Sequence, residues 1–309
     1  MRILVLGAGV IGSVYAGKLQ QAGHDVVLLA RGRRLSDLQT HGLVLEEAQS
    51  GQRTVQATQA VREPDADDHF DLVLVPVRSE QLASTLPVLT GMSDGSDVLF
   101  FGNTAGRQAE LTAALGERAL FGFPAAGGVR EGLAVRYVLI SQQKTMLGES
   151  NGMTTTRVQQ LQDAFRDAGF PSKISANIDG WLLAHAAFVV PIAFALYRVG
   201  TNAAELAGDP KTLRQMVLAT RQAFRALRAA GNAEIPTNLR VLYLYLPTAF
   251  VVGYWRRVLA SARGELWFGA HSRAAPEEMR VLAEELRAAL LRTGRPTPDL
   301  EILLSDAHL

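Results

Sequence analysis

The sequence predicts an α/β protein: an N-terminal Rossmann doubly wound sheet followed by an all-helical C-terminal domain. Three observations support this. Short continuous apolar runs alternate with helical stretches as far as about Ser172, as expected for parallel strands covered on both faces. A glycine motif directly follows the first apolar run. From about Ile178 onward, good helix formers dominate. We therefore predict a Rossmann domain at residues 1–172 and a helical domain at 173–309.

The elements of the first domain follow from its apolar runs and their flanking residues. The predicted strands are Ile3–Leu6, Val26–Leu29, Leu72–Val77 and Val98–Phe101. The predicted helices are Val10–Gln21, Ser79–Leu86, Arg107–Leu115 and Thr156–Ala168. Leu43–Glu47 and Thr54–Val61 are predicted to form an inserted hairpin, and Ala134–Ile140 with Lys144–Leu147 to form antiparallel pieces. The domain is thus predicted to hold a parallel sheet with additions.

Two apolar stretches of the second domain approach the composition of a membrane span. Trp181–Tyr197 and Val241–Trp255 are at or below the roughly 17–25 residues that a span requires. Each contains a proline, Pro191 or Pro247. We therefore expect buried helices and no membrane association.

Composition excludes several classes of function. Lys plus Arg number 31 against 30 Asp plus Glu, so no net field favours nucleic acid or anionic lipid. The chain has no cysteine, which excludes disulfides and thiolate nucleophiles and is consistent with a cytoplasmic location. No cluster of metal-ligating residues is evident, so no metal is expected.

The glycine motif predicts a phosphate-binding turn. Gly7-Ala8-Gly9-Val10-Ile11-Gly12 fits G-x-G-x-x-G, and it lies between a predicted strand and a predicted helix. In this motif the first glycine makes the turn, the second lets the backbone approach a pyrophosphate, and the third lets helix and strand pack closely. The helix N-terminus then offers N–H groups to the phosphates. We predict that residues 7–12 bind a dinucleotide.

The end of the second strand indicates which dinucleotide is bound. An NAD site places Asp or Glu there, whereas this sequence has Arg31, Arg33 and Arg34. Guanidinium groups can hold a 2′-phosphate through charge-assisted hydrogen bonds. The pattern favours NADP, with a solvated basic turn as the alternative.

With these residues in place, the sequence resembles the ketopantoate reductase (2-dehydropantoate 2-reductase) family over nearly its whole length. The resemblance rests on the glycines, Arg31, the Leu72–Arg78 strand end, Phe101-Gly102-Asn103 and a Trp-bearing helix after residue 178. It implies NADPH-dependent reduction of a 2-oxo acid, best known in pantothenate biosynthesis. It also implies that Asn103 lies near nicotinamide and substrate, and that Arg78 replaces a lysine beside the coenzyme.

The resemblance fails on the first helix of the second domain. Where the family has a proton-donating lysine and two asparagines, this chain has Leu183, Ala187 and Pro191. Residues four apart share a helix face, so a polar stripe has become apolar. Loss of a positioned general acid costs about 10²–10⁴ in rate. The change points to a less polar substrate or a different proton donor.

Two residues are candidates for the missing chemistry. His185 is the alternative proton donor, although it lies about 200° around an ideal helix from Leu183; a core histidine is an equal alternative. Glu265 matches a family acid that binds the substrate hydroxyl, with a solvent-facing charge as its alternative. Should the two converge, a carboxylate–imidazole pair would tune the proton donor.

Three functions therefore remain open. The first is an NADPH-dependent reductase with an altered carbonyl substrate, the second is the family reaction with a rearranged donor, and the third is a non-catalytic NADPH-binding or sensor protein. In each, a small molecule is the expected partner. The apolar helices of the second domain also suggest a homodimer.

Overall fold

The computed structural model describes residues 1–65, 68–92, 95–141, 143–231, 233–261 and 264–305, with the backbone alone at Leu266 and His271. The chain divides into two compact units. Unit 1 comprises Met1–Thr104 and Gln108–Ile178, and unit 2 comprises Ala105–Arg107 and Asp179–Leu309. The division thus falls after Ile178, later than the predicted boundary at 172/173. That the units are separate domains stays a prediction.

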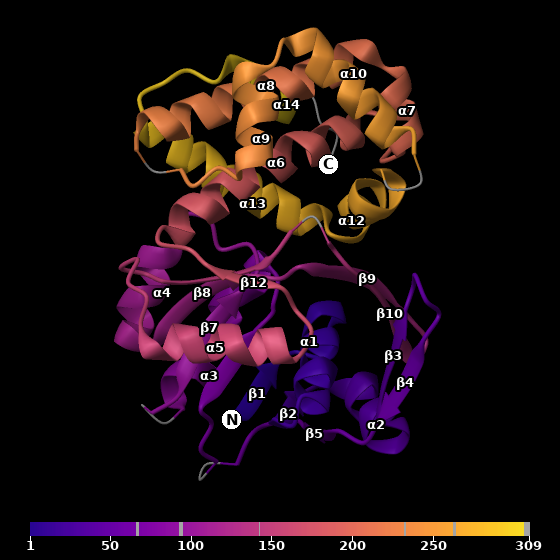
Figure 1. The fold of residues 1–309 in the computed structure, drawn as a ribbon, viewed down its shortest axis with the longest axis vertical. Coiled ribbons are helices and arrows are strands. Elements are labelled where there is room, and N and C mark those ends of the chain that lie inside the picture. The colour runs from indigo at the N-terminus through magenta and orange to yellow at the C-terminus, as the bar shows by residue number, and fades with distance from the viewer. Residues whose placement is uncertain (66–67, 93–94, 142, 232, 262–263, 306–309) are drawn as a thin grey trace. The chain divides into compact units, whose positions relative to one another are not determined.

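An eight-stranded sheet forms the centre of unit 1 (Figure 1). Its order is β12-β11-β8-β7-β6-β1-β2-β5. The strands are β1 (Arg2–Leu6), β2 (Asp25–Leu29), β5 (Gln59–Val61), β6 (Leu72–Val75), β7 (Asp97–Phe101), β8 (Ala119–Phe123), β11 (Thr145–Glu149) and β12 (Ser172–Ile174). From β5 to β8 all pairs are parallel, whereas β11 runs antiparallel to β8. The order β5-β2-β1-β6-β7-β8 is that of a Rossmann fold, and the predicted fold class is confirmed.

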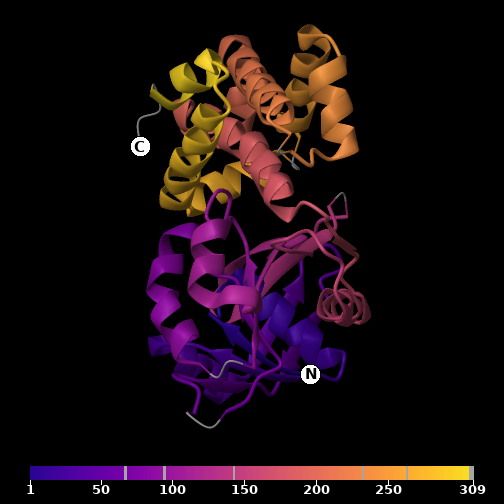
Figure 2. The same cartoon turned by 90° about the vertical axis from the view of Figure 1, so that its left-hand side faces the viewer.

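Helices cover both faces of this sheet. They are α1 (Val10–Gln21), α2 (Gly32–His41), α3 (Leu82–Gly91), α4 (Gln108–Leu115) and α5 (Thr156–Asp167), with short 3₁₀ turns η1 (Ser79–Gln81) and η2 (Gly116–Arg118). Helix α1 contacts α5, and α3 contacts α4. Figure 2 shows the magenta helices and the pink α5 on opposite sides of the unit 1 sheet. Helix α2 is not among the predicted helices, because most of its residues are polar.

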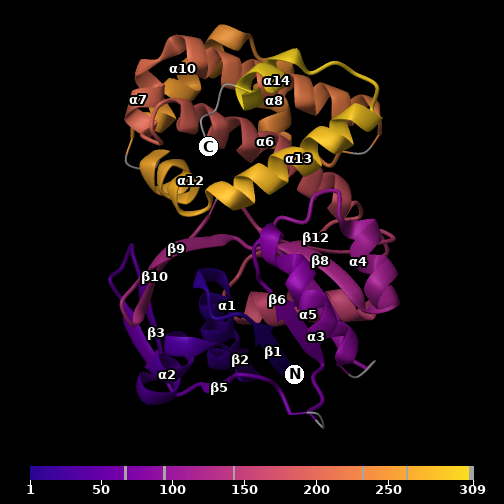
Figure 3. The same cartoon turned by 180° about the vertical axis from the view of Figure 1, so that it is seen from behind.

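A four-stranded sheet of order β4-β3-β10-β9 packs beside α1 (Figure 3). Its strands are β3 (Leu43–Glu47), β4 (Arg53–Gln56), β9 (Ala126–Glu131) and β10 (Ala134–Leu139). The structure confirms the first part of the predicted hairpin, and the second part is wrong. β4 pairs antiparallel with β3, but Gln59–Val61 forms β5 and joins the large sheet beside β2. Pairing with β2, which lies far away in sequence, decides this and cannot be seen in the local pattern.

The core of unit 1 lies where α1 packs between the two sheets. Tyr15 is fully buried at its centre and stacks on Phe170, with ring centroids 3.9 Å apart. Its hydroxyl lies 2.6 Å from Thr145 Oγ1 and accepts a 3.1 Å hydrogen bond from the Ala125 amide. Because a buried hydroxyl needs such partners, Tyr15 fixes α1 against the sheet.

The regular elements that the structure describes in unit 2 are all helices. Its elements are α6 (Ile178–Arg198), α7 (Ala203–Gly208), α8 (Pro210–Ala229), α9 (Thr237–Arg240), the π-helix η3 (Val241–Tyr245), α10 (Thr248–Leu259), the π-helix η4 (Glu265–Gly269), α12 (Ala270–Ala274), α13 (Pro276–Arg292) and α14 (Pro298–Ser305). Helix α8 begins with the side chain of Asp209 accepting hydrogen bonds from the amides of Lys211 and Thr212. This is a standard N-cap.

The first apolar stretch of unit 2 forms a core helix. Of the described helices, α6 alone has the length and mean hydropathy, 1.8, of a membrane span, and 78% of that stretch is buried inside the structure. Core helices of globular proteins have the same character. The second stretch is divided between η3 and α10, with Leu246 and Pro247 between them.

Candidate functional site

The glycine motif forms the turn from β1 into α1. Gly7 has a φ of +125°, in the region that favours glycine. A Cβ at Gly12 would collide with the carbonyl oxygen of Gly7, so helix and turn can pack this closely only without a side chain. A Cβ at Gly9 would have no heavy atom within 4 Å. The backbone at Gly9 therefore faces open space.

The N-terminus of α1 suits an anion. The helix has 12 residues, no acidic residue in its first turn and no side-chain cap at Gly9. The amides of Val10 and Ile11 belong to that first turn, where N–H groups have no partner within the helix. Together with the helix dipole they attract phosphate.

The turn lies at the switch point of the sheet. From β1 the chain leads to β2 on one side, whereas β6 pairs with β1 on the other. In open α/β sheets, ligands bind beyond the carboxyl ends of the strands at such a point. A Cβ at Gly7 would lie 3.7 Å from Val77 and one at Gly12 3.1 Å from Pro76. The end of β6 thus borders the glycine turn.

Arg78 and Asn103 follow neighbouring strands at this same edge. Arg78 is exposed and precedes η1, and its amide donates a 3.4 Å hydrogen bond to Gln81 Oε1. Asn103 is buried at the end of β7, and its carbonyl oxygen accepts a hydrogen bond from the hydroxyl of Ser79. This bond ties the segments after β6 and β7 together. Ser79 was not singled out from the sequence, because a single serine after a strand carries no specific signal.

The three arginines after β2 have different surroundings, which corrects the expectation that all three clamp a phosphate. Arg34 is buried, and its guanidinium donates hydrogen bonds to Ser13 Oγ at 3.1 Å and Leu133 O at 3.3 Å. The side chain of Arg33 is 94% exposed and lies 3.9 Å from Asp37. Arg31 is the exposed N-cap of α2. Arg34 is therefore occupied within the protein, whereas Arg31 and Arg33 are exposed, and a phosphate contact by Arg31 stays a prediction.

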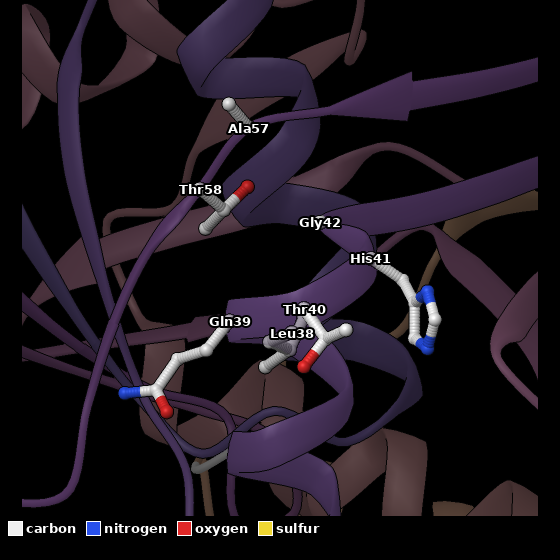
Figure 4. Close-up of a pocket in the computed structure, with 7 residues that line it drawn as sticks. All are labelled: Leu38, Gln39, Thr40, His41, Gly42, Ala57 and Thr58. Atoms are coloured by element: carbon white, nitrogen blue, oxygen red, sulfur yellow. The ribbon is translucent and has the colours of Figure 1, made fainter.

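One hollow on unit 1 lies away from this edge. It has a volume of about 330 Å³ and is lined by the C-terminal end of α2, Gly42, Ala57 and Thr58. In Figure 4, Gln39 and His41 point in opposite directions from the helix end. The helix has ten residues, so this hollow is about 15 Å from Arg31 along its axis. It has no charged side chain placed for phosphate, and we do not assign the coenzyme to it.

The predicted proton donor, His185, stacks on Trp181. Both residues are on α6, four positions apart, with ring centroids 5.4 Å apart and an interplanar angle of 8°. His185 is half-buried. Leu183 and Ala187, at the positions where the resemblance expects lysine and asparagine, are buried. The stacking orients the imidazole, but it does not test the assigned proton transfer.

Glu265 opens the π-helix η4 and is held by Arg273. The guanidinium of Arg273 donates to the Glu265 carboxylate and, at 2.9 Å, to the carbonyl of Thr201. This hydrogen bond, with one from the Ala203 amide, lowers the pKa of Glu265 below its ordinary value. The carboxylate is therefore charged at neutral pH and accepts hydrogen bonds. Because Arg273 occupies it, these contacts do not support the hypothesis that Glu265 pairs with His185. π-Helices often occur at functional sites.

The residues of unit 1 fit a dinucleotide coenzyme. The space above Gly9 and the amides of α1 suit a pyrophosphate, and Arg31 offers a guanidinium where the adenosine ribose follows. The described residues include no group of three or more His, Asp or Glu side chains arranged to hold a metal ion.

Comparison with known proteins places this chain beside oxidoreductases. Residues 3–152 match the family model "Ketopantoate reductase PanE/ApbA". The chain is 28% identical over 182 residues to a 2-dehydropantoate 2-reductase of Pyrococcus horikoshii, covering 59% of this chain and 58% of the relative. It is 28% identical over 186 residues to that of Pyrococcus abyssi, covering 60% of each. The chain thus matches about three fifths of the length of these relatives.

Solved structures show the same fold. A 2-dehydropantoate 2-reductase from Geobacter metallireducens superposes with a TM-score of 0.83 at 19% identity, covering 99% of both chains. A D-mandelate dehydrogenase with NADH and anilino(oxo)acetate gives a TM-score of 0.75 at 17% identity, covering 100% of this chain and 97% of the other.

Proposed function

Residues 3–152 match the ketopantoate reductase family model. We propose that this chain is an NADPH-dependent oxidoreductase of that type, which reduces a 2-oxo acid or related carbonyl compound to the hydroxy compound. The proposal rests on the residues that gather at one edge of the unit 1 sheet. There the glycine turn, Arg31, Arg78 and Asn103 follow β1, β2, β6 and β7. This edge is where Rossmann enzymes bind their coenzyme.

The preference for NADPH rests on Arg31. The N-cap of α2 is a cation in this chain, whereas an NAD-specific site has a carboxylate that binds the ribose 2′-hydroxyl. An arginine at this position can form an ion pair with the 2′-phosphate, which NADPH carries and NADH lacks. The D-mandelate dehydrogenase of the same fold was solved with NADH, so both coenzymes belong in the test.

The roles of the side chains follow from their chemistry. When bound, the coenzyme supplies a hydride to the carbonyl carbon of the substrate. Asn103 positions the substrate, and Glu265, as a charged carboxylate, accepts a hydrogen bond from its hydroxyl group. His185 supplies the proton to the carbonyl oxygen, since its half-buried imidazole is the titratable group nearest in sequence to Leu183.

The substrate we propose is less polar than 2-dehydropantoate. Leu183 and Ala187 are buried and apolar where the family resemblance expects lysine and asparagine. An apolar wall offers no hydrogen bond to a hydroxyl on the substrate, and leaving that hydroxyl unpaired weakens binding. A 2-oxo acid with an alkyl or aryl side chain matches this wall better.

Steady-state assays with a panel of carbonyl compounds test the proposal. The panel contains 2-dehydropantoate, alkyl 2-oxo acids and aryl 2-oxo acids, each with NADPH and with NADH. We expect kcat/KM with NADPH to be highest for an alkyl or aryl 2-oxo acid. Efficient turnover of 2-dehydropantoate would instead show that the family reaction continues with a rearranged donor. If NADPH binds tightly but no compound of the panel oxidises it, the result would contradict a reductase.

That last outcome would favour a second candidate, a non-catalytic NADPH-binding or sensor protein. The feature that favours it is the same apolar substitution at Leu183 and Ala187. Calorimetry would then show tight binding of NADPH to the protein, although no carbonyl compound of the panel oxidises the bound NADPH.

Two further features belong to the proposal. The lack of cysteine supports a function in the reducing cytoplasm. Exposed apolar side chains on η3 and α10 support a homodimer; they are Val241, Tyr245, Phe250 and Tyr254.

A further inference from the structure

We propose that Arg130, on the β9–β10 hairpin, is a second specificity-determining cation of the coenzyme site and contacts the 2′-phosphate together with Arg31. The inference rests on the proposed use of NADPH. It concerns a residue about one hundred positions after Arg31, in a strand outside the large sheet. All the residues involved belong to unit 1.

The hairpin reaches the first turn of α2. Arg34 follows Arg31 by three residues, one turn of helix, and its guanidinium donates a 3.3 Å hydrogen bond to the carbonyl oxygen of Leu133. Leu133 lies in the tight connection between β9 (Ala126–Glu131) and β10 (Ala134–Leu139). The Arg31–Arg34 turn and the tip of the hairpin are therefore adjacent.

The strand register places Arg130 on the side of the hairpin that faces the helices. Arg130 lies opposite Val135 in the antiparallel pair, and residues directly opposite each other share a face of the sheet. Val135 is fully buried in the core that also contains Val14 of α1 and Leu38 of α2. The neighbouring Glu131 has the opposite orientation, since successive side chains alternate. Arg130 is exposed, at the edge of this face.

Charge at this place is unbalanced. The positive charge of Arg130 adds to burial in lowering the pKa of Arg34, so the two guanidinium groups repel each other; Asp37 acts in the opposite direction. Asp37 thus lies beside Arg33 and partly offsets the repulsion between Arg34 and Arg130. A dianionic phosphate would relieve this repulsion, as in other clusters of arginine around phosphate esters.

Hydrogen bonding and exposure distinguish Arg34 from Arg31 and Arg130. The hydrogen bonds of Arg34 to Ser13 and Leu133 are made within the protein, whereas Arg130 and Arg31 are exposed. Arg34 therefore positions the cluster, and Arg31 with Arg130 offers hydrogen-bond donors to a ligand. The two come from separate elements, α2 and β9, so they can approach a phosphate from two sides.

Binding affinities of four proteins test the inference: the wild type, Arg31→Ala, Arg130→Ala and the matched control Arg136→Ala. Arg136 is on the same hairpin, loses the same charge when replaced, and lies one position from Val135, on the opposite face. Calorimetry measures the Kd of NADPH, NADH and the fragment 2′-AMP. We expect Arg130→Ala to raise the Kd of NADPH and of 2′-AMP about tenfold, which is the scale of one charge-assisted hydrogen bond. The Kd of NADH should stay unchanged. Arg136→Ala is expected to change none of them by more than about twofold.

The outcomes separate this inference from the proposed function. A wild type that binds NADH as tightly as NADPH overturns both. A wild type that prefers NADPH, with a preference unchanged in Arg130→Ala, overturns only the role of Arg130. An equal loss of affinity for NADPH and NADH in Arg130→Ala would also overturn the role of Arg130, because the substitution would then act through the fold and not through the 2′-phosphate. Arg130→Lys, which keeps the charge, is expected to recover most of the NADPH affinity.

Discussion

Arg34 donates a 3.1 Å hydrogen bond to the hydroxyl of Ser13, which in turn donates to the carbonyl of Ala8 at 3.3 Å. Ala8 is the second residue of the glycine turn, and Ser13 is fully buried. The first turn of α2 is thus joined to the glycine turn through one hydroxyl. Arg34 therefore helps to hold the backbone of the glycine turn, where we propose that the coenzyme binds.

Replacing Arg34 by alanine is expected to destabilise unit 1. It removes hydrogen bonds from a charged group to Ser13 and Leu133, each contributing about 1.5–3 kcal/mol. Because the variant also removes the repulsion between Arg34 and Arg130, we expect a net loss of about 2–4 kcal/mol in the free energy of unfolding, less than the sum of the two hydrogen bonds, measured by urea titration. The control is Arg33→Ala, whose side chain is 94% exposed and should cost less than about 0.5 kcal/mol. Equal losses in the two variants would contradict this role.

Alanine substitutions at two glycines of the motif are expected to have different effects, one on NADPH binding and the other on stability. Gly9→Ala meets no heavy atom within 4 Å and has an ordinary φ of −70°, so the protein should fold with unchanged or slightly higher stability. Its methyl group enters the space assigned to the pyrophosphate, and NADPH affinity should fall at least about tenfold by calorimetry. Unchanged NADPH affinity would contradict the placement of the coenzyme.

Gly12→Ala serves as the matched variant, because its Cβ would collide with the Gly7 carbonyl. Overpacking of this kind costs about 1–3 kcal/mol. We expect a lower free energy of unfolding in Gly12→Ala than in Gly9→Ala, measured by urea titration. The reverse order would show that the turn packs differently.

His185→Ala tests the proposed proton donor. If the imidazole protonates the substrate, kcat should fall about 10²–10⁴-fold, while the Kd of NADPH stays unchanged. His185→Gln keeps a polar side chain against Trp181 but has no titratable group, so it should lose activity to the same extent. Full activity of the glutamine variant would remove His185 from the chemistry and leave it a packing role.

The ion pair of Glu265 with Arg273 predicts a pH dependence of stability. Because the pKa of Glu265 is lowered from 4.5, the pair stabilises the folded state above pH 4.5, and this stabilisation is lost as the pH falls through the lowered value. Both side chains are nearly half exposed, at 45% and 48%, so solvent screens the pair. Glu265→Gln should cost about 0.5 kcal/mol at pH 7.

In acid, the wild type and Glu265→Gln should have the same free energy of unfolding. Urea titrations at pH 7 and at pH values below 4.5 measure this difference. A difference that grows in acid would contradict the sign. In the activity assay at pH 7, Glu265→Gln should raise KM more than it lowers NADPH affinity, since the proposed contact is with substrate.

Phe250→Glu tests self-association. The side chain of Phe250 is 58% exposed on α10, near Tyr254 at 43%. A charge placed in a buried apolar interface is strongly unfavourable. We expect a dimer for the wild type and a monomer for Phe250→Glu, by light scattering after gel filtration. Leu291→Glu, on α13 and 72% exposed, is the control and should not change the mass.

The sequence by itself determined the elements that local patterns encode. The apolar runs at Ile3–Leu6 and Val98–Phe101 predict buried parallel strands, because both faces of such a strand need apolar side chains. The glycine spacing from Gly7 to Gly12 predicts the turn and the helix after it, because a tight turn and close packing of helix on strand both favour residues without a side chain. Helix Val10–Gln21 has the same bounds in prediction and structure.

Tertiary structure decided what depends on residues far apart in the chain. Arg31 and Arg34 look alike in sequence, but only the contact with Ser13 and Leu133 buries Arg34 and leaves Arg31 exposed. Gln59–Val61 joined β2 rather than β4, and Arg130 came to α2 through the register of β9 on β10. Pairing partners, burial and local electric field are properties of the folded neighbourhood, and a linear pattern of residue types does not contain them.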